Sequence, residues 1–366
     1  MKAVVATCFE SNEERLRFVA ETLKNRGDDV KIFTSDFSHI RKTKRDTIPE
    51  GFTAVSTKPY HKNLSLARIL SHRRFAKDVF GLIREEKPDL IWLMAPANTL
   101  IQEAKKFKAQ YPSVKLILDI IDMWPESLPI SISKDILPFK MWRAVRKNNI
   151  DCCDLLITEC DLYQEILKKE YKGRIETIHW ARDAHSHTGE LKAKDDQLSL
   201  VYIGSINNII DTDRIASIIS NIDMPVKLHV IGEGENTEQF LSALEKVCEL
   251  EYHGAIRDEE KKSAIFERCH AGINIYKEGL YIGLTVKCID YFEHGLPIIN
   301  NIHGDTWELV KKYNAGINVG EDLKICGQDL IEMRKNNHSV CDLFDENLSK
   351  DIFVKKCRKA IDEVMK

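Results

Sequence analysis

Short apolar runs alternate with longer amphipathic runs along almost the whole chain, and this alternation restricts the fold more than any other feature. Strands that are apolar throughout and alternate with helices are typical of a parallel sheet covered by helices on both faces. In the first half, the sequence predicts strands at residues 2–7, 30–34, 89–94, 114–120, 154–158 and 175–178. Between them it predicts helices at residues 12–26, 66–85, 97–111 and 136–150, and one that ends near residue 170, with a basic loop at 35–65.

Residues 181–197 interrupt this pattern, because they are polar and lack periodicity, which is typical of a linker. The alternation then restarts, with strands predicted at residues 198–203, 226–231, 250–253, 271–276, 297–300 and 316–319. Helices are predicted to begin at Asp213, Thr237, about Asp258, Thr285 and near Trp307, and only helices follow Leu323.

The fold class is therefore α/β, with two doubly wound Rossmann-like domains that we expect to face each other across a cleft. We assign residues 1–184 to an N-terminal domain, 185–197 to a linker and 198–345 to a C-terminal domain. Residues 346–366 are expected to form a helix that packs back towards the N-terminal domain. Ligands of such folds bind beyond the carboxyl ends of the strands.

Composition excludes several classes of protein. The chain has 366 residues, 43% of them hydrophobic and 30% charged, as in a soluble globular protein. It has no run of about 18 apolar residues that could span a membrane, and its start turns acidic too early for a signal peptide. We therefore expect a cytoplasmic protein. Its ten cysteines contain no CxxC pair, so we interpret them as reduced core residues and not as a zinc site.

Charge is unevenly distributed. Residues 1–150 contain 27 Lys and Arg against 18 Asp and Glu, whereas the remaining residues contain 27 against 39. Three basic segments, at residues 39–45, 68–74 and 140–147, all lie in the first domain. They could contact an anionic membrane at its inner face, or simply keep helix faces solvated. Because no nucleic-acid-binding module accompanies this charge, we expect no nucleic-acid partner.

The segment from Tyr276 to Asn300 is the most informative for function. A predicted strand ends near Tyr276 and a helix begins at Thr285, which can cap it. Helix N-termini attract phosphate, and Lys287 in the first turn could add a positive charge. Asp290 follows one turn later on the same face, where it could accept hydrogen bonds from sugar hydroxyls. A surface helix with a Lys–Asp pair is the alternative interpretation.

Five motifs in order extend this interpretation: residues 119–127 (DIIDMWPES), 153–158 (CDLLIT), 202–205 (YIGS), 228–234 (LHVIGEG) and 287–297 (KCIDYFEHGLP). Together they resemble the motifs of family 4-like glycosyltransferases of the GT-B fold, over residues 1–320. The resemblance implies that Lys287 contacts the donor diphosphate and that Asp290, in place of the usual Glu, binds the ribose. It implies donor contacts also for other residues: Gly204, Ser205, Gly232, Glu233, Gly254, Ala255, Glu278, Gly283 and Thr285.

The sequence departs from the family pattern in three places. Many members have an E-x7-E pair, but Ile282 stands eight residues before Asp290, and Glu278 is the nearest acid. Residues 7–11 (TCFES) lack a Gly-Gly turn, and residues 179–183 (HWARD) are all that corresponds to an N-G-x-D turn.

The loop after the predicted strand at 114–120 is expected to bind the acceptor. Asp122 is our candidate for a catalytic base or for positioning the acceptor, and Trp124 and Glu126 are expected to contact the acceptor. A packed loop anchor is the alternative for Trp124. Asp211 and Asp213 resemble a metal-binding DxD motif, but we interpret Asp213 as a helix N-cap and expect no metal at the donor.

The resemblance thus implies a transferase that moves a sugar from a nucleotide-sugar, UDP-linked by expectation, to a glycan or polyprenyl-diphosphate-linked acceptor. We expect the transfer to belong to surface polysaccharide biosynthesis. Retention of configuration is the usual outcome in the family, and we expect that no cofactor is required. Two alternatives stay open: a sugar-nucleotide epimerase of the same fold, and a non-catalytic protein that binds a partner or glycan.

Overall fold

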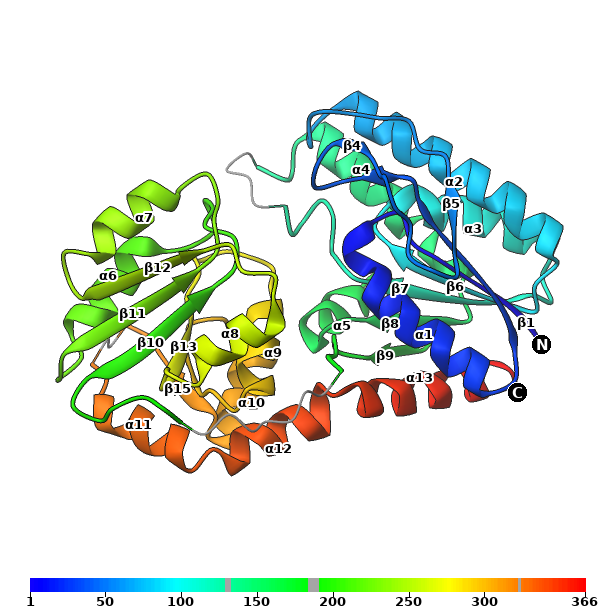
Figure 1. The fold of residues 1–366 in the computed structure, drawn as a ribbon. Helices are drawn as coiled ribbons and strands as arrows, with labels where there is room; N and C mark the ends of the chain where they lie inside the picture. The colour runs from blue at the N-terminus through cyan, green and yellow to red at the C-terminus, as the bar shows by residue number, and fades with distance from the viewer. Residues whose placement is uncertain (129–132, 184–190, 322–323) are drawn as a thin grey trace. The chain divides into compact units, whose positions relative to one another are not determined.

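A computed structural model describes residues 1–128, 133–183, 191–321 and 324–366 (Figure 1). The chain divides into two compact units. The first contains residues 1–179 and 353–366, and the second contains residues 180–352. Residues 185–190 of the expected linker lie outside the described part of the chain, and residues 191–197 lead into the first strand of the second unit.

The first unit is built on a parallel seven-stranded sheet with the order β5-β2-β1-β6-β7-β8-β9. Its strands are β1 (Lys2–Ala6), β2 (Asp29–Ser35), β5 (Phe52–Val55), β6 (Leu90–Ala95), β7 (Lys115–Ile120), β8 (Leu155–Thr158) and β9 (Ile175–Thr177). Its helices are η1 (Glu10–Asn12), α1 (Glu13–Asn25), α2 (Leu66–Glu86), α3 (Asn98–Gln110), α4 (Leu137–Lys147), η2 (Ile150–Cys152) and α5 (Asp161–Leu167). The central strand β6 is entirely buried, as its unbroken apolar sequence predicts.

The basic stretch between β2 and α2 is more ordered than the sequence analysis predicted. The sequence predicts a loop there, but the stretch contains edge strand β5 and a two-stranded antiparallel hairpin, β3 (Phe37–Ser38) with β4 (Thr43–Lys44). These strands have two to four residues, too few for an alternating pattern to stand out among neighbouring polar side chains.

The second unit contains a parallel six-stranded sheet with the order β12-β11-β10-β13-β14-β15. Its strands are β10 (Leu198–Ile203), β11 (Val226–Ile231), β12 (Glu249–Gly254), β13 (Ala271–Asn274), β14 (Ile298–Asn300) and β15 (Gly316–Asn318). Numbered within the unit, this order is 3-2-1-4-5-6, that of a dinucleotide-binding Rossmann fold. The order reverses between β10 and β13, so the carboxyl ends of these strands form the switch point at which such sheets bind ligands.

Helices cover both faces of this second sheet (Figure 1). They are α6 (Thr212–Ser220), α7 (Thr237–Leu244), α8 (Glu259–Phe266), α9 (Val286–Glu293), α10 (Asp305–Tyr313), α11 (Gly327–Lys335) and α12 (His338–Asn347). On one face, alternate residues of β10 and β11 join α6 and α7 in an apolar core that includes Leu200, Leu228 and Phe240.

The last helix, α13 (Lys350–Val364), belongs to the first unit from residue 353 onward. There Phe353 is 2% exposed, and its ring packs against Phe18 of α1 at a centroid distance of 5.8 Å. The Arg15 guanidinium lies over the same ring. Within the described residues, no helix is long and apolar enough to cross a membrane.

Candidate functional site

A cavity of about 420 Å³ lies at the carboxyl end of β10, at the switch point of the second sheet. Its wall is mostly apolar with a few polar side chains, as is usual for sites that hold a small molecule. It is lined by Ile203, Gly204, Ser205, Asn207, Ile209, Ile210, Tyr276, Ile282, Leu284, Thr285, Val286, Lys287 and Asp290. The cavity thus gathers five of the residues expected to contact a donor: Gly204, Ser205, Thr285, Lys287 and Asp290.

Two glycines shape the loops after β10 and β11. Gly204 has φ 122° and Gly232 has φ 141°, conformations that residues with a Cβ rarely adopt. A Cβ on Gly232 would lie 2.0 Å from the Gly204 carbonyl oxygen, so the two loops can touch only because Gly232 lacks a side chain. A Cβ on Gly204 would point at Lys287, whose Cε would be 3.6 Å away. Gly204 therefore leaves room beside that lysine.

The start of α9 is fixed by hydrogen bonds on both sides. Thr285 is its N-cap, and its hydroxyl oxygen accepts a hydrogen bond from the Cys288 amide at 3.3 Å. The same hydroxyl donates to Asn274, at the end of β13, at 2.7 Å. Deeper in the helix, the Tyr291 hydroxyl donates to the Val201 carbonyl and accepts from the Ile203 amide. These bonds hold the positive end of the α9 dipole against the end of β10.

Lys287 is buried without a charged partner. Its side chain is 8% exposed, and its Nζ has no hydrogen-bond partner among the described residues. The ammonium group instead lies over two aromatic rings, 4.1 Å from the Tyr202 centroid and 4.7 Å from that of Tyr276. Burial lowers the pKa of Lys287 to about 7. Since buried charges are normally paired, this arrangement calls for an anion in the cavity.

Asp290 forms an ion pair that the sequence did not predict. One of its carboxylate oxygens accepts a hydrogen bond from Arg182 Nε at 3.1 Å. A carboxylate offers several acceptor positions, so Asp290 can bind Arg182 and a hydroxyl group at the same time. Arg182 stands 108 positions earlier, in the short HWARD remnant, and no spacing rule connects the two residues.

Of the described residues expected at the donor, six lie outside the wall of this cavity: Gly232, Glu233, Gly254, Ala255, Glu278 and Gly283. Glu278 has a side chain that is 86% exposed and pairs with Arg214. The Gly232 amide donates to the Gly254 carbonyl, and the Gly283 carbonyl accepts from Thr306. Donor contacts by these residues stay a prediction. The interpretation of Asp213 as an N-cap is wrong, because Asp211 caps α6 through the Arg214 amide.

In the first unit, Asp122 lies on the loop after β7, next to an aromatic cluster. Burial raises the pKa of Asp122, and the Ser127 hydroxyl donates a hydrogen bond to its carboxylate. Trp124 is 8% exposed and stacks on His72, with the Arg68 guanidinium 4.1 Å from its ring centroid. Sequence reasoning missed this use of Arg68 and His72, which it had placed in a basic surface segment.

The carboxylates on either side of Asp122 are engaged in ion pairs. Glu126 accepts hydrogen bonds from Arg146 at 2.7 and 3.0 Å and from Arg143 at 2.9 Å. Burial opposes ionisation of Glu126, but these bonds prevail and lower its pKa. Asp119 is fully buried and forms a bidentate pair with Arg15. Acceptor binding by Glu126 stays a prediction, and its present contacts are structural.

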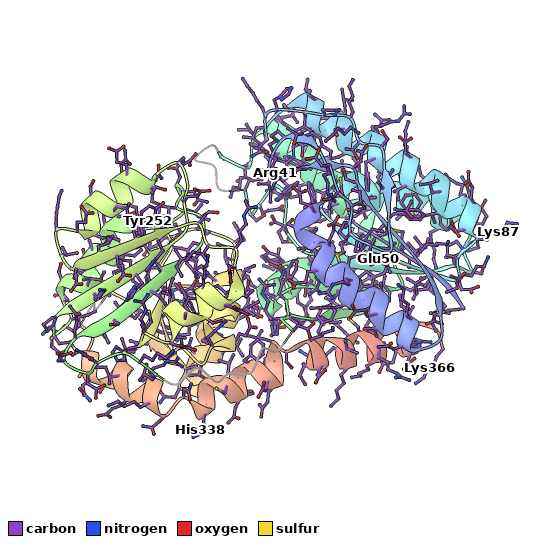
Figure 2. All side chains as sticks on the ribbon, viewed as in Figure 1. Arg41, Glu50, Lys87, Tyr252, His338 and Lys366 are labelled. Atoms are coloured by element: carbon purple, nitrogen blue, oxygen red, sulfur yellow. The ribbon has the colours of Figure 1, made fainter. Side chains whose placement is uncertain are left out.

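Parts of the basic segments are therefore buried, and the remainder lies beside exposed apolar side chains. Arg41, shown at the surface in Figure 2, neighbours Ile40, which is 72% exposed. Leu66 on α2 is 78% exposed, and Leu137 and Met141 on α4 are 70% and 63% exposed.

No family model matches this sequence, and no curated protein does. Solved structures match the whole fold at low identity. Sucrose-phosphate synthase from Thermosynechococcus elongatus superposes with a TM-score of 0.75 at 12% identity, covering 100% of this chain and 99% of that one. The lipopolysaccharide outer core galactosyltransferase WaaB gives 0.70 at 14% identity, covering 99% of each chain. Anabaena HepE in complex with UDP-glucose gives 0.64 at 10% identity, covering 99% of this chain and 100% of that one.

The chain has the GT-B fold. Both expected Rossmann-like domains are present, and the match runs over essentially the full length of each structure compared. In this GT-B chain the Lys287 cavity occupies the switch point of the second sheet. The fold class that the sequence predicted is confirmed.

Proposed function

We propose that this GT-B chain is a glycosyltransferase whose donor is a nucleoside-diphosphate sugar bound in the Lys287 cavity. The observation that carries the proposal is the buried, unpaired ammonium group of Lys287 beside the N-terminus of α9. A diphosphate would supply the missing anion, and the first amide groups of α9 have no acceptor within the helix and can donate to it. The complexes of HepE with UDP and with UDP-glucose support uridine as the nucleoside of the donor.

The chemistry follows from where negative charge develops. When the bond between sugar and diphosphate breaks, charge accumulates on the leaving phosphate. Lys287 and the α9 dipole lie where they can stabilise it, and they are fixed before the reaction begins. Asp290, oriented by Arg182, would accept hydrogen bonds from the ribose. This charge stabilisation needs no metal ion at the donor.

The acceptor, by this proposal, binds to the first unit near Asp122. The raised pKa of Asp122 suits a group that takes a proton from an attacking hydroxyl, if the reaction inverts configuration. If it retains configuration, as we infer from the sequence motifs, the leaving phosphate can take this proton. We propose a glycan or lipid-linked acceptor in surface polysaccharide synthesis, which the similarity to WaaB supports.

Contact with a membrane is part of the same proposal. Exposed apolar side chains at Ile40, Leu66, Leu137 and Met141 lie among exposed basic residues, a mixture that suits an anionic lipid surface. A lipid-linked acceptor would be reached from such a position.

One observation favours a second candidate, a binding protein without transferase activity. Ile282 lines the cavity at the position where many family members have an acid, and Glu278 points into solvent. An apolar side chain there cannot accept hydrogen bonds from sugar hydroxyls.

The deciding experiment incubates the purified protein with a panel of UDP-, GDP-, ADP- and dTDP-sugars, with and without an extract of lipid-linked glycans. Nucleoside diphosphate release is followed over time. We expect release with one donor, faster with acceptor, and a loss of at least tenfold in Lys287→Ala. Conversion of the donor's sugar without release would indicate an epimerase. Binding without turnover of any donor would favour the second candidate.

A further inference from the structure

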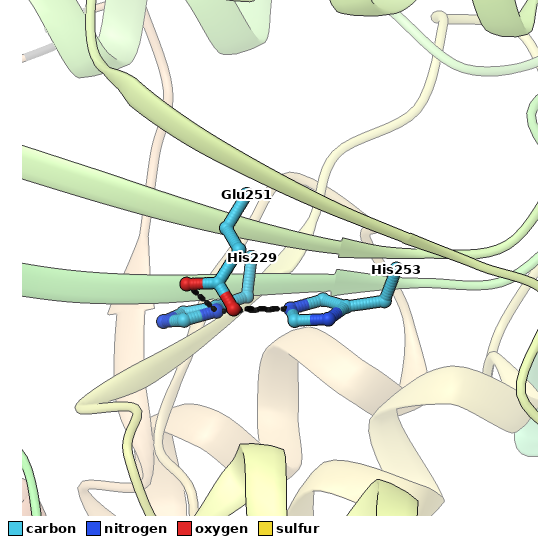
Figure 3. A group of neighbouring side chains, drawn as sticks. All are labelled: His229, Glu251 and His253. Atoms are coloured by element: carbon cyan, nitrogen blue, oxygen red, sulfur yellow. Dashed lines mark hydrogen bonds and ion pairs between the residues drawn. The ribbon is translucent and has the colours of Figure 1, made fainter.

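Three metal-ligating side chains meet on β11 and β12, away from the Lys287 cavity (Figure 3). His229 lies between Leu228 and Val230, both of which face the apolar core, so its side chain faces the opposite side of the sheet. Glu251 pairs with His229 in the register of the two strands. His253 follows two residues later, where the pairing of β12 with β11 shifts by one residue.

The donor atoms of these three side chains lie close together. His229 Nδ1 lies 3.1 Å from His253 Nε2. Glu251 contributes one oxygen 3.6 Å from His229 Nδ1 and the other 3.6 Å from His253 Nε2. Ligands bound at about 2.1 Å to a tetrahedral zinc ion are separated from each other by about 3.4 Å. The two nitrogens and the nearest carboxylate oxygens are therefore spaced close to the separation that such a site requires, and one donor atom from each residue lies within 4.8 Å of the others.

The surroundings also suit a metal ion. The His229 side chain is 3% exposed and that of His253 is 14% exposed, whereas Glu251 at 36% leaves the site open to solvent. Burial lowers the pKa of both histidines, which favours the neutral imidazole, the form that ligates metals. One of the two rings donates its N–H to the other in the hydrogen bond between them. When a metal binds, that hydrogen would move to the second nitrogen of the same ring.

Nearby cations do not block the site. Lys227 Nζ lies 2.9 Å from a Glu251 oxygen and is paired at the same distance with Glu249. Arg268 lies 3.7 Å from Glu251. Each carboxylate oxygen can accept more than one bond, so Glu251 can keep Lys227 as a neighbour that orients it while it ligates a metal.

We propose that His229, Glu251 and His253 bind a divalent transition-metal ion, with Zn²⁺ as the best match to two imidazoles and one carboxylate. Because the group has three members in the part of the chain that the structure describes, water fills the fourth position. The ion joins edge strand β12 to β11. This site is separate from the donor cavity and does not depend on the proposed function.

The test titrates Zn²⁺ into chelator-treated protein by calorimetry and records the Co²⁺ spectrum of the same protein. We expect one equivalent of Zn²⁺ to bind, and a tetrahedral Co²⁺ spectrum without thiolate charge-transfer bands. His253→Ala and Glu251→Gln change partly exposed side chains, and each should weaken binding at least tenfold. Both variants should keep the melting temperature of the metal-free wild type within a few degrees.

Two controls match these variants. His338→Ala removes an exposed histidine of α12, labelled in Figure 2, and Glu249→Gln removes the neighbouring carboxylate that also pairs with Lys227. Both should bind Zn²⁺ as the wild type does. Zn²⁺ binding that is unchanged in His253→Ala, thiolate bands in the Co²⁺ spectrum, or no binding at all would overturn the proposal.

Discussion

Lys287 illustrates how one residue can point to a ligand. A solvated lysine keeps its charge at little cost, whereas Lys287 is surrounded by Tyr202, Tyr276 and an apolar wall. Burial favours the neutral form and lowers the pKa of its ammonium group to about 7. An anion in the cavity would reverse this shift. The unfavourable free energy of burying the ammonium group is therefore offset when the anion binds.

This coupling predicts how UDP affinity depends on pH. Below pH 7, Lys287 is protonated before UDP arrives, so the contribution of Lys287 to UDP affinity is at its maximum. Above pH 7 the free protein must take up a proton on binding, and affinity falls until pH reaches the higher pKa of the complex. From pH 7.5 to 9 we expect the Kd to rise about twentyfold. Calorimetry in two buffers of different ionisation enthalpy measures the proton uptake, and its absence at pH 8.5 would contradict the assignment.

Asp290 should affect the nucleoside and not the phosphates. Asp290→Ala removes the proposed acceptor for ribose hydroxyls, so we expect UDP to bind about tenfold to a hundredfold more weakly. Pyrophosphate lacks ribose and should bind this variant as tightly as it binds the wild type, or more tightly because a negative charge is gone. Competition with a fluorescent nucleotide measures both ligands. Equal losses for UDP and pyrophosphate would show that Asp290 acts through Lys287 or through the fold.

For single residues, the sequence predicted which side chains lie together in the site only where those residues are close together in the chain. Thr285, Lys287 and Asp290 follow from helix capping and helix periodicity, and all three line one cavity. Arg182 could not be predicted, because its contact with Asp290 joins distant segments. The cluster of Arg68 and His72 around Trp124 was missed for the same reason, since a basic segment alone predicts solvent exposure.

Among the elements, the loops after β10 and β11 depend most on one residue type. The structure explains the Gly232-x-Gly234 motif by packing: a Cβ on Gly234 would lie 2.2 Å from the Ile206 carbonyl oxygen, and Gly232 meets Gly204 just as closely. Glycine-rich turns of this kind look alike in sequence whether they contact a ligand or another loop. Only the three-dimensional contacts separate the two cases.

Gly232→Ala should therefore lower the free energy of unfolding by at least about 2 kcal/mol, because a positive φ and a backbone collision combine. Gly81→Ala is the matched control. Gly81 lies within α2 with open space around its Cα, so alanine there should raise stability by about 0.5–1 kcal/mol. Urea denaturation measures both. A Gly232→Ala protein as stable as the wild type would contradict this account of the loops.

Element prediction succeeded for the strands that alternate with helices and failed for β3, β4 and β5 in the basic stretch between β2 and α2. Residues 90–95 are a continuous apolar run and residues 226–231 alternate apolar and polar side chains, and the structure has β6 and β11 there. The β3–β4 hairpin pairs Phe37–Ser38 with Thr43–Lys44. The carboxylate of Glu10, on η1, stabilises this hairpin by accepting hydrogen bonds from the backbone amides of His39 and Ile40. Those long-range bonds leave no periodic signal in the sequence.

For the whole molecule, the chain passes from the second unit back to the first at residue 353. Phe353→Ala removes the ring that packs on Phe18 and Arg15, and we expect the first unit to lose about 3–5 kcal/mol. The second unit, which holds the Lys287 cavity, should keep its UDP-dependent stabilisation, about 2.7 kcal/mol at 100 times the Kd. Calorimetric melting with and without UDP separates the two transitions. If UDP no longer stabilised the second unit of Phe353→Ala, the division of the chain into two separately folded units would be contradicted.

The central claim is that the Lys287 cavity binds the diphosphate of a nucleotide-sugar. The most direct measurement is calorimetric titration of UDP into the wild type, Lys287→Ala and Lys311→Ala, which removes an exposed lysine of α10. We predict one UDP per chain in the wild type and in Lys311→Ala, with a Kd at least tenfold higher in Lys287→Ala. UDP binding of equal strength in all three proteins, or in none, would contradict the claim.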